Sequence, residues 1–490
     1  MGIPASAVSR VTGVDVSFKN FNIGRAQKLP QRVAIVGVGN DDAVYPLDKF
    51  EIEGSASAVG DRFGYGSPLH LAALQFFPQI GRAAVFPVTC YPLAKATTAV
   101  PASGSIEATG TATASGSGTV TLGGQRVQFA VPKNTPAAEV LAIIKTAITG
   151  SLNVPVLTGA IADNELPIIS KWAGASSNKI KIKVSANIPG IIFAVTAMAG
   201  GALDPNVTPA LERVGIVWET QVLNTFDYAD NDRLDLYQQW AEGRRSPEEK
   251  KMVLICHGCT DILATRTAIS DPRIYDSSNY FIVSVNSDEL PFVVAAKGMI
   301  DDVITTANSN PAQGYKGRLN GLHCGADDQQ ENSTQRNMSV LKGSSTNIKT
   351  GSVAELCDII TFYHPPNEGK FPSYRYVVDA VKLQNIIFNV RLIMEADELK
   401  GAPLVTDDTV TSNPAAVSPK VIKGWFINLT DSLADEALIT DPGHTKKNIA
   451  VYIDTENPKR VNVKYPVKLS GNVEISSTDI FFGFYLGDAM

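Results

Sequence analysis

The densest group of potentially reactive side chains is Cys256-His257-Gly258-Cys259, and His323-Cys324 could complete it. Thiolates and imidazoles are the ligands of structural zinc sites, so the group could form half of such a site. Against this, no second Cys-x-x-Cys occurs. Cys256 also closes an apolar run, where a cysteine usually packs as a small hydrophobic residue. We therefore favour a structural role for these residues and predict no metal site.

Two glycines that follow an apolar run, Gly37 and Gly39, could begin a dinucleotide-binding turn. The third glycine of that motif is missing, because Asp42 stands in its place. Neither a Gly-x-x-x-x-Gly-Lys phosphate loop nor a Gly-x-Ser-x-Gly elbow occurs. Five histidines are a small supply of general acid–base groups for 490 residues. We predict no cofactor and no catalytic residue; an α/β enzyme with an appended β domain is the less favoured alternative.

The composition is that of a globular protein, with 44% hydrophobic and 19% charged residues. A chain of 490 residues is too long to fold around one hydrophobic core, so two to four domains are expected. The net charge of -6, without a basic domain, gives no support for binding nucleic acid. Five scattered cysteines indicate a reducing compartment. The uncharged stretch between Lys183 and Asp204 is broken by Pro189 and several glycines, so we expect no membrane insertion.

Buried strands that alternate with amphipathic helices predict a central α/β domain with helices on both faces of its sheet. One helix should run from Ser67, its N-cap, to Phe77, with Pro68 in the first position. The predicted strands are 33–39, 83–88, 214–218, 252–256 and 280–285, and the other predicted helices are 228–242, 261–270 and 290–307.

A different kind of sequence separates the two halves of this domain. Between Ala96 and Gln125 the single charged residue is Glu107. One helix, with Thr135 as N-cap and Pro136 in its first position, interrupts a series of short strands. The predicted strands are 118–122, 126–130, 154–158, 166–170 and 179–184. Residues 97–202 therefore read as an inserted β-rich domain.

The last third of the chain predicts a C-terminal α+β domain. A polar loop over 308–345 should lie at a surface or interface. Two helices follow, 377–399 and 419–432, then an extended run at 448–454. In a final strand over 461–469, the apolar residues Val461, Val463, Tyr465 and Val467 alternate with polar ones, and Pro466 marks an edge or a bulge. The full expected layout is an arm at 1–24, an α/β domain at 25–96 and 203–375, the insert at 97–202, an inner domain at 376–478 and an arm at 479–490.

Both chain ends are strand-like. Val14, Val16 and Phe18 alternate with polar residues, and the apolar run near the other end contains Ile480, Phe482, Phe484 and Leu486. A terminal apolar strand needs a partner for its backbone groups. It could pair within its own subunit, or be donated to a neighbour whose acceptor edge holds 461–469. The residues alone leave both possibilities open.

The order of several short motifs resembles the Mu-like contractile phage tail sheath proteins. They are Ser9-Arg-Val-Thr-Gly-Val-Asp-Val-Ser-Phe, Arg32-Val-Ala-Ile-Val-Gly, Arg62-Phe-Gly-Tyr-Gly-Ser-Pro-Leu-His and the 111–184 region. The helix and strand order of the last hundred residues also fits, so the resemblance spans nearly the whole chain. The resemblance favours donation of the terminal strands between subunits over their pairing within one subunit.

The resemblance implies a structural protein of the virion, assembled in the bacterial host cytoplasm. Such subunits form stacked hexameric rings around a tail tube and interlock through their terminal arms. On a baseplate signal the sheath contracts and drives the tube through the cell envelope; the implied partners are further copies, the tube protein, and baseplate and tail-terminator proteins. Another self-assembling tube or shell protein is the alternative. The candidate tube contacts are Lys420, Lys423 and Asp431 on helix 419–432 and Asp435 just beyond it.

Overall fold

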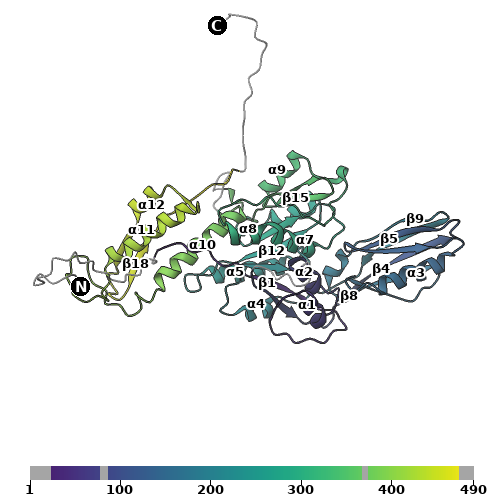
Figure 1. Ribbon diagram of the computed structural model, residues 1–490, viewed down its shortest axis with the longest axis horizontal. Helices are drawn as coiled ribbons and strands as arrows, with labels where there is room; N and C mark the ends of the chain where they lie inside the picture. The colour runs from purple at the N-terminus through teal and green to yellow at the C-terminus, as the bar shows by residue number, and fades with distance from the viewer. Residues whose placement is uncertain (1–23, 78–85, 367–373, 474–490) are drawn as a thin grey trace, which may run out of the picture. The chain divides into compact units, whose positions relative to one another are not determined.

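The computed structural model describes residues 24–77, 86–366 and 374–473 (Figure 1). The chain divides into two compact units, which are described separately. The larger one comprises Gln27–Pro311 and Tyr315–Ala396, and the smaller one comprises the chain up to Ala26, Ala312–Gly314 and the chain from Asp397 onward. Helix α10 (Val377–Met394) therefore lies in the larger unit, whereas we expected it in the C-terminal domain. Its Gln384 explains this, because the side chain donates to the backbone carbonyls of Thr220 and Met252 there.

A six-stranded sheet forms the centre of the larger unit. Its order is β13-β12-β11-β1-β3-β2, and every neighbouring pair is parallel except β2 with β3. All six residues of β1 are buried, as expected for a strand covered on both faces. The strands are β1 (Val33–Val38), β2 (Phe50–Glu51), β3 (Val88–Leu93), β11 (Gln221–Asn224), β12 (Leu254–Cys259) and β13 (Asn279–Val283).

Helices cover both faces of this sheet. A Cβ at Gly258 would collide with the Pro291 carbonyl of α7, so that face of β12 lies against α7. The neighbouring residue of β12, His257, faces the opposite side of the sheet. Its ring packs there on Tyr237 of α5, with ring centroids 5.7 Å apart. A π-helical turn, η2, joins α7 to α8. The helices are α1 (Ser57–Phe63), α2 (Pro68–Phe76), α4 (Thr208–Val214), α5 (Asn231–Arg245), α6 (Leu263–Ser270), α7 (Pro291–Gly298), η2 (Met299–Val303) and α8 (Ile304–Ser309).

The sequence predicted one helix start correctly because the capping side chain bonds to a backbone group close to it in the chain. The Ser67 hydroxyl accepts from the His70 N–H at 3.2 Å and caps α2, as predicted. The predicted strand 214–218 is wrong: α4 continues to Val214, Ile216 is 88% exposed, and the strand is β11. Polar residues of β11 are buried with partners, for example Gln221, which accepts from the Tyr280 hydroxyl at 3.0 Å. Hydrophobicity therefore did not reveal this strand.

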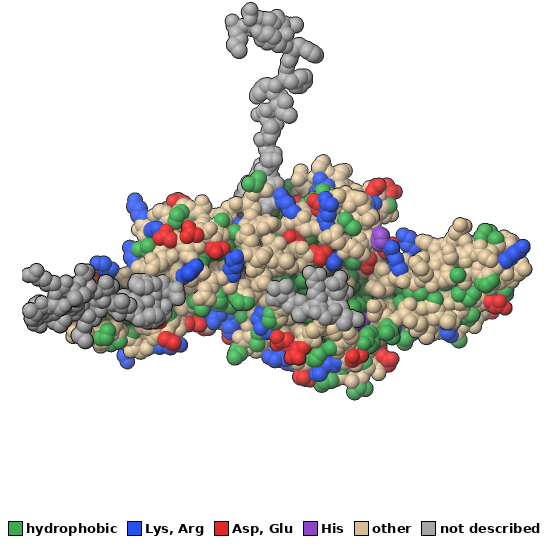
Figure 2. All heavy atoms as spheres, viewed as in Figure 1, with side chains coloured by type: hydrophobic (Ala, Val, Ile, Leu, Met, Phe, Trp, Pro, Cys, Tyr) green, Lys and Arg blue, Asp and Glu red, His purple; other side chains and the backbone are tan. Residues whose placement is uncertain are grey.

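The insert contains two antiparallel sheets and one helix. Their orders are β10-β4-β8-β7 and β6-β5-β9. Thr135 does not cap the helix as we expected, because its hydroxyl donates to the Pro132 carbonyl at 2.8 Å and Pro136 takes the N-cap position. Figure 2 shows few charged side chains over this part of the molecule. The elements are β4 (Pro101–Gly110), β5 (Gly116–Leu122), β6 (Gln125–Val131), α3 (Ala137–Thr149), β7 (Val156–Thr158), β8 (Glu165–Ala173), η1 (Ala175–Lys179), β9 (Ile182–Asn187) and β10 (Ile191–Ala199).

The expected loop over 308–345 contains structure of its own. Arg266, fully buried, holds Glu331 through two contacts of 2.5 and 2.6 Å and donates to Ser339 and Ser344. This polar segment thus packs around a buried ion pair. The spacing of apolar residues could therefore not reveal the helix at 333–341. The elements of this region are η3 (Asp327–Gln329), α9 (Ser333–Leu341), β14 (Thr346–Thr350) and β15 (Val353–Asp358).

The smaller unit is α+β. Helix α11 extends three residues beyond its predicted end, so that Asp435 is its last residue. No helix in the described ranges has both the length and the apolar character needed to cross a bilayer. The elements are α11 (Pro419–Asp435), β16 (Ile439–Thr440), α12 (Pro442–Asn448), β17 (Ala450–Ile453), β18 (Val461–Lys464) and β19 (Lys468–Leu469).

Candidate assembly interface

The two predicted donor strands belong to the chain ends. Val14, Val16 and Phe18 lie outside the described residues. Ile480, Phe482, Phe484 and Leu486 also lie outside them. The candidate interface is therefore built from the predicted acceptor and from α11, both of which the structure describes.

The acceptor region is a two-stranded antiparallel hairpin of β17 and β18. Ala450 pairs with Lys464 and Ile453 with Val461. Among the described residues, neither strand pairs with a further strand on its outer edge. A two-stranded hairpin is marginally stable alone in water, and its outer edges offer unpaired backbone groups. Within the described part of the chain the hairpin therefore has two edges without a partner strand, where we had predicted one.

The outward-facing backbone groups follow from the register. The Asp454 N–H donates to the Arg460 carbonyl at 2.9 Å, which makes these residues a hydrogen-bonded pair. Such pairs alternate along an antiparallel ladder with pairs whose N–H and C=O groups point away from the partner strand. Val463, opposite Val451, therefore presents both of its backbone groups to the outer edge of β18. Val461 does the same, and Val451 and Ile453 do so on the β17 edge.

One face of the hairpin packs on α11. Val451 and Ile453 are half-buried, whereas Ala450 and Tyr452 between them are exposed. Cross-strand partners share a face, so Val461 and Val463 lie on the same side as the half-buried pair. Helix α11 contributes a buried stripe to this contact: Ile422, Phe426, Leu429 and Leu433. The backing helix holds the hairpin in place while its edges stay open.

Tyr465 anchors the chain at the end of β18. Its ring packs on Phe426 with centroids 5.1 Å apart, and its hydroxyl lies 3.1 Å from that of Thr430. Burial raises the pKa of Tyr465. The predicted continuous strand over 461–469 is wrong: β18 ends at Lys464, and β19 pairs instead with β16. Pro466, which lacks an N–H, stands at the break, so Val467 lies between two strands and not in one.

The four candidate tube contacts lie on α11, and their charges oppose the helix dipole. Lys420 and Lys423 occur in the N-terminal turns, and Asp431 and Asp435 in the C-terminal turns. A helix is stabilised by anions at its N-terminus and cations at its C-terminus, with about 0.3–1 kcal/mol per charge. The arrangement on α11 is the reverse, so these charges do not stabilise the helix itself.

The neighbours of these charges compensate in part. The Asp407 carboxylate accepts from the Lys420 backbone N–H at 2.8 Å, and so supplies an anion to the N-terminus of α11. Asp431 forms an ion pair with Lys446 of α12. The side chains of Lys420 and Asp435 are exposed. Charge at both ends of α11 is thus available to another molecule.

The segment leading from the N-terminal arm runs along α11. A Cβ at Gly24, where φ is +84°, would collide with the Trp425 carbonyl, so glycine is required there twice over. Two residues on, the Ala26 N–H donates to the Ser432 hydroxyl at 2.8 Å. The arm therefore starts from the helix that backs the hairpin. Sequence reasoning missed this contact, because it joins residues 406 positions apart in the chain. The extended run predicted at 448–454 contains β17.

The zinc candidate does not form a site. Cys256 and Cys259 are three residues apart on β12, so their side chains point to opposite faces of the sheet. Burial raises the pKa of the Cys259 thiol to about 11 and lowers that of His257 to about 4. His257 is held between Asn224 and Asn279. No cluster of three potential ligands occurs in the described part of the chain.

The place where α/β sheets usually bind ligands is filled by the insert. In this sheet the topological switch point lies between β1 and β11, at their carboxyl ends. There the Asp41 N–H donates to the Lys171 carbonyl at 2.9 Å, and the Asp41 carboxylate accepts from the Ala173 N–H at 3.2 Å. Gly37, from the weak dinucleotide motif, lies against Thr225. The residues of that motif thus hold the insert and the sheet together.

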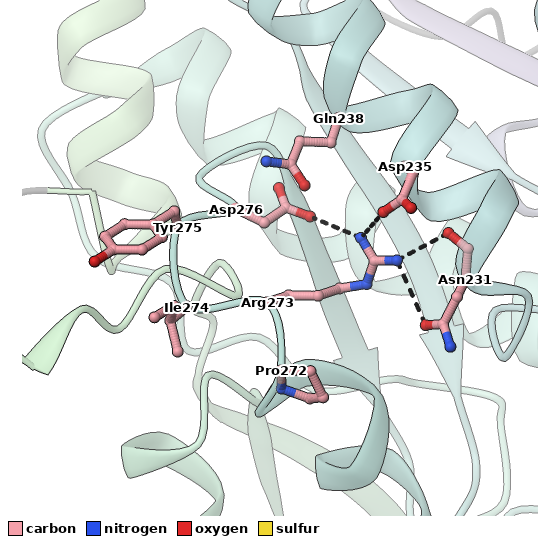
Figure 3. A pocket seen from close by; sticks show the side chains of 8 residues that line it. All are labelled: Asn231, Asp235, Gln238, Pro272, Arg273, Ile274, Tyr275 and Asp276. Atoms are coloured by element: carbon pink, nitrogen blue, oxygen red, sulfur yellow. Dashed lines mark hydrogen bonds and ion pairs between the residues drawn. The ribbon is translucent and has the colours of Figure 1, made fainter.

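A pocket of about 430 Å³ beside α5 is also structural (Figure 3). Arg273 lies at its centre and donates to the Asn231 carbonyl at 2.8 Å. It forms ion pairs with Asp235 at 2.8 Å and with Asp276 at 4.0 Å. Both aspartates of the pocket, Asp235 and Asp276, are engaged by Arg273. Arg273 ties α5 to the turn that follows α6.

Comparison with known proteins gives one informative similarity. The chain is 23% identical over 380 residues to the Mu-like prophage FluMu tail sheath protein of Haemophilus influenzae, an alignment that covers 76% of this chain and 77% of the relative. This confirms the resemblance to Mu-like tail sheath proteins seen in the sequence. The relative is a tail sheath protein and not an enzyme, in agreement with our prediction for this chain. No protein-family model matches the chain.

Two solved structures show weaker likeness. The sheath tail protein of Desulfitobacterium hafniense is 12% identical with a TM-score of 0.48, covering 93% of this chain and 96% of that one. The sheath tail protein Lin1278 of Listeria innocua is 11% identical with a TM-score of 0.49, covering 91% and 94%. At such scores and identities, neither likeness supports a conclusion about this chain.

Proposed function

We propose that this chain is a structural subunit of a contractile phage tail sheath. The alignment with a Mu-like tail sheath protein over three quarters of both chains carries the proposal. In the proposed assembly, subunits form stacked hexameric rings around a tail tube and join baseplate and tail-terminator proteins at the ends. Contraction of this polymer drives the tube through the bacterial envelope.

The open hairpin supports assembly by strand donation. The outer edge of β18 offers two N–H and two C=O groups, from Val461 and Val463, and the β17 edge offers as many. Each backbone hydrogen bond made there contributes roughly 0.5–1.5 kcal/mol net. Phe482 and Phe484 of an incoming strand would each add roughly 1.5–3 kcal/mol if fully buried. In this proposal, Val14–Phe18 and Ile480–Leu486 of neighbouring copies supply the donated strands.

Helix α11 is the proposed tube contact. Its charges follow an order that helix stability does not explain, basic at the N-terminus and acidic at the C-terminus. A tube surface with acidic groups facing Lys420 and Lys423, and basic groups facing Asp435, would match it. The same helix backs the hairpin, so the proposed tube contact and the proposed polymer contacts share one rigid element.

Truncation tests strand donation within this proposal. Variants that lack residues 1–20 or 480–490 should remain folded and yet form no ordered sheath in negative-stain images. Wild-type protein should form wide, striated, hollow cylinders; smooth tubes or closed shells would favour a different self-assembling protein. Ordered sheaths from either truncated variant would contradict assembly through the termini.

A further inference from the structure

The insert meets the α/β domain of the larger unit at a turn that rests on a buried carboxyl group. Gly123 and Gly124, with φ of +54° and +85°, form the two-residue turn of the β5–β6 hairpin. A Cβ at Gly124 would collide with the carboxyl group of Glu289, and one at Gly123 would lie 3.1 Å from Leu290. Glu289 is 5% exposed and lies just before Leu290, the N-cap of α7. The turn of one domain is thus seated on a single ionisable side chain of the other.

Further contacts fix the insert to the same short segment. Lys181 donates to the Ser287 carbonyl at 2.6 Å, and Lys183 pairs with Asp288 at 3.2 Å. The carboxyl group of Glu289 is therefore at the centre of the contact between the β5–β6–β9 sheet and the start of α7. A change in its charge acts where the two domains touch.

Space for a different carboxylate position exists beside the contact. A pocket of about 390 Å³ is lined by Glu289, Arg126, Lys297 and His323, among others. Arg126 is exposed, and it stabilises the charged form of Glu289. Glu289 lines this pocket together with Gly124, so its carboxyl group borders both the glycine turn and the open space beside it.

We propose that protonated Glu289 latches the β5–β6 turn of the insert onto the segment that begins α7, and that loss of the proton releases the turn. The proton exchanges with solvent through the pocket, and no other group is transformed. The insert is held in one orientation while Glu289 is neutral and gains freedom when it is charged. The latch is a property of the single chain and does not depend on the proposed function.

The surroundings of Glu289 set the pH at which the latch opens. Burial raises the pKa of Glu289 to about 7, and the His323 backbone N–H and Arg126 oppose that rise. Burial lowers the pKa of His323, and so does the nearby Arg126. The charged and titratable groups facing the site are Arg126 from β6, Lys183 paired with Asp288, His323, and Lys297 paired with Asp301 at 3.1 Å. Lys183 and Lys297 are each paired with a carboxylate, so the substitution Glu289→Gln distinguishes the titration of Glu289 from that of His323.

Double electron–electron resonance tests the latch directly. Spin labels at Glu107→Cys in β4 and Asp232→Cys in α5, both exposed positions, report the distance between the insert and the α/β domain. Cys324 and Cys357 are replaced by serine to prevent labelling there. We expect a narrow distance distribution at pH 5.5 that broadens with a midpoint near pH 7. In the same background, Glu289→Gln should keep the narrow distribution at every pH.

Two further variants separate the latch from a general effect of pH. Arg126→Gln should raise the midpoint by roughly 0.2–0.7 pH unit, because the charged form of Glu289 loses its nearby cation. Glu139→Gln, an exposed acid on α3 of the insert, should behave as the wild type does. A distribution that does not change with pH in the wild type would overturn the proposal. So would pH-dependent broadening that persists in Glu289→Gln.

Discussion

Replacing Val463 with proline separates the outer edge of β18 from the fold of the hairpin itself. The Val463 N–H points away from β17, so proline removes no hydrogen bond of the β17–β18 ladder. Proline at an edge position with an outward N–H is compatible with a strand. An incoming strand, however, loses one bond to β18, about 0.5–1.5 kcal/mol, and keeps an unpaired buried carbonyl that costs about 1–3 kcal/mol.

These values translate into a shift in assembly. A total of about 1.5–4.5 kcal/mol raises the concentration needed for polymerisation by about 10- to 1000-fold. The matched control is Val463→Ala, which also removes the half-buried side chain and keeps the N–H. Pelleting across a concentration series measures polymer formation, and thermal unfolding by circular dichroism checks that both variants fold alike. Polymerisation of Val463→Pro at the same concentration as Val463→Ala would refute β18 as an acceptor edge.

Three other predictions follow from the same structure. Joint Lys420→Glu and Lys423→Glu substitution should leave the melting temperature unchanged or slightly higher, because the new charges suit the helix dipole. The same variant should no longer co-pellet with tail tubes. Retained co-pelleting would exclude this surface of α11 as the tube contact. Asp407→Ala removes the carboxylate at the α11 N-terminus and should reduce the free energy of unfolding by about 1 kcal/mol in a denaturant titration. Replacement of Glu456, an exposed acid of the same unit, by alanine is the control and should leave it unchanged. The raised pKa of Glu289 means that the folded state holds this proton more tightly than the unfolded state. The free energy of unfolding should therefore be greatest below about pH 4.5 and fall as the pH rises through about 7, by up to about 3 kcal/mol in total. Glu289→Gln should remove this part of the pH dependence, and a stability profile that the substitution leaves unchanged would contradict the prediction.

Sequence patterns predicted the elements whose side chains carry their own signal. The apolar run of β1 and the Ser67-Pro68 start of α2 needed no tertiary information. In contrast, the strand β4 consists mostly of small and polar residues and gave no apolar alternation. Helix α9 was invisible because its buried residue, Ser339, faces Arg266. Where the core is polar, a hydrophobic pattern cannot locate it.

The candidate interface was predicted in part. The alternation at 461–469 located an edge strand, and Pro466 correctly indicated an irregularity there. The pattern could not show that Tyr465 would turn onto Phe426 and end the strand, because that contact joins residues far apart in the sequence. Nor could it show that β17 leaves a second edge open. Both facts depend on how α11 supports the hairpin.

Electron cryomicroscopy of the assembled polymer tests the central claim most directly, at a resolution that traces the chain ends. The account predicts that β17 and β18 are each extended by a strand, and that these strands are residues 14–18 or 480–486 of neighbouring copies. Outer edges left open, or covered by the same subunit's own ends, would contradict assembly by strand donation.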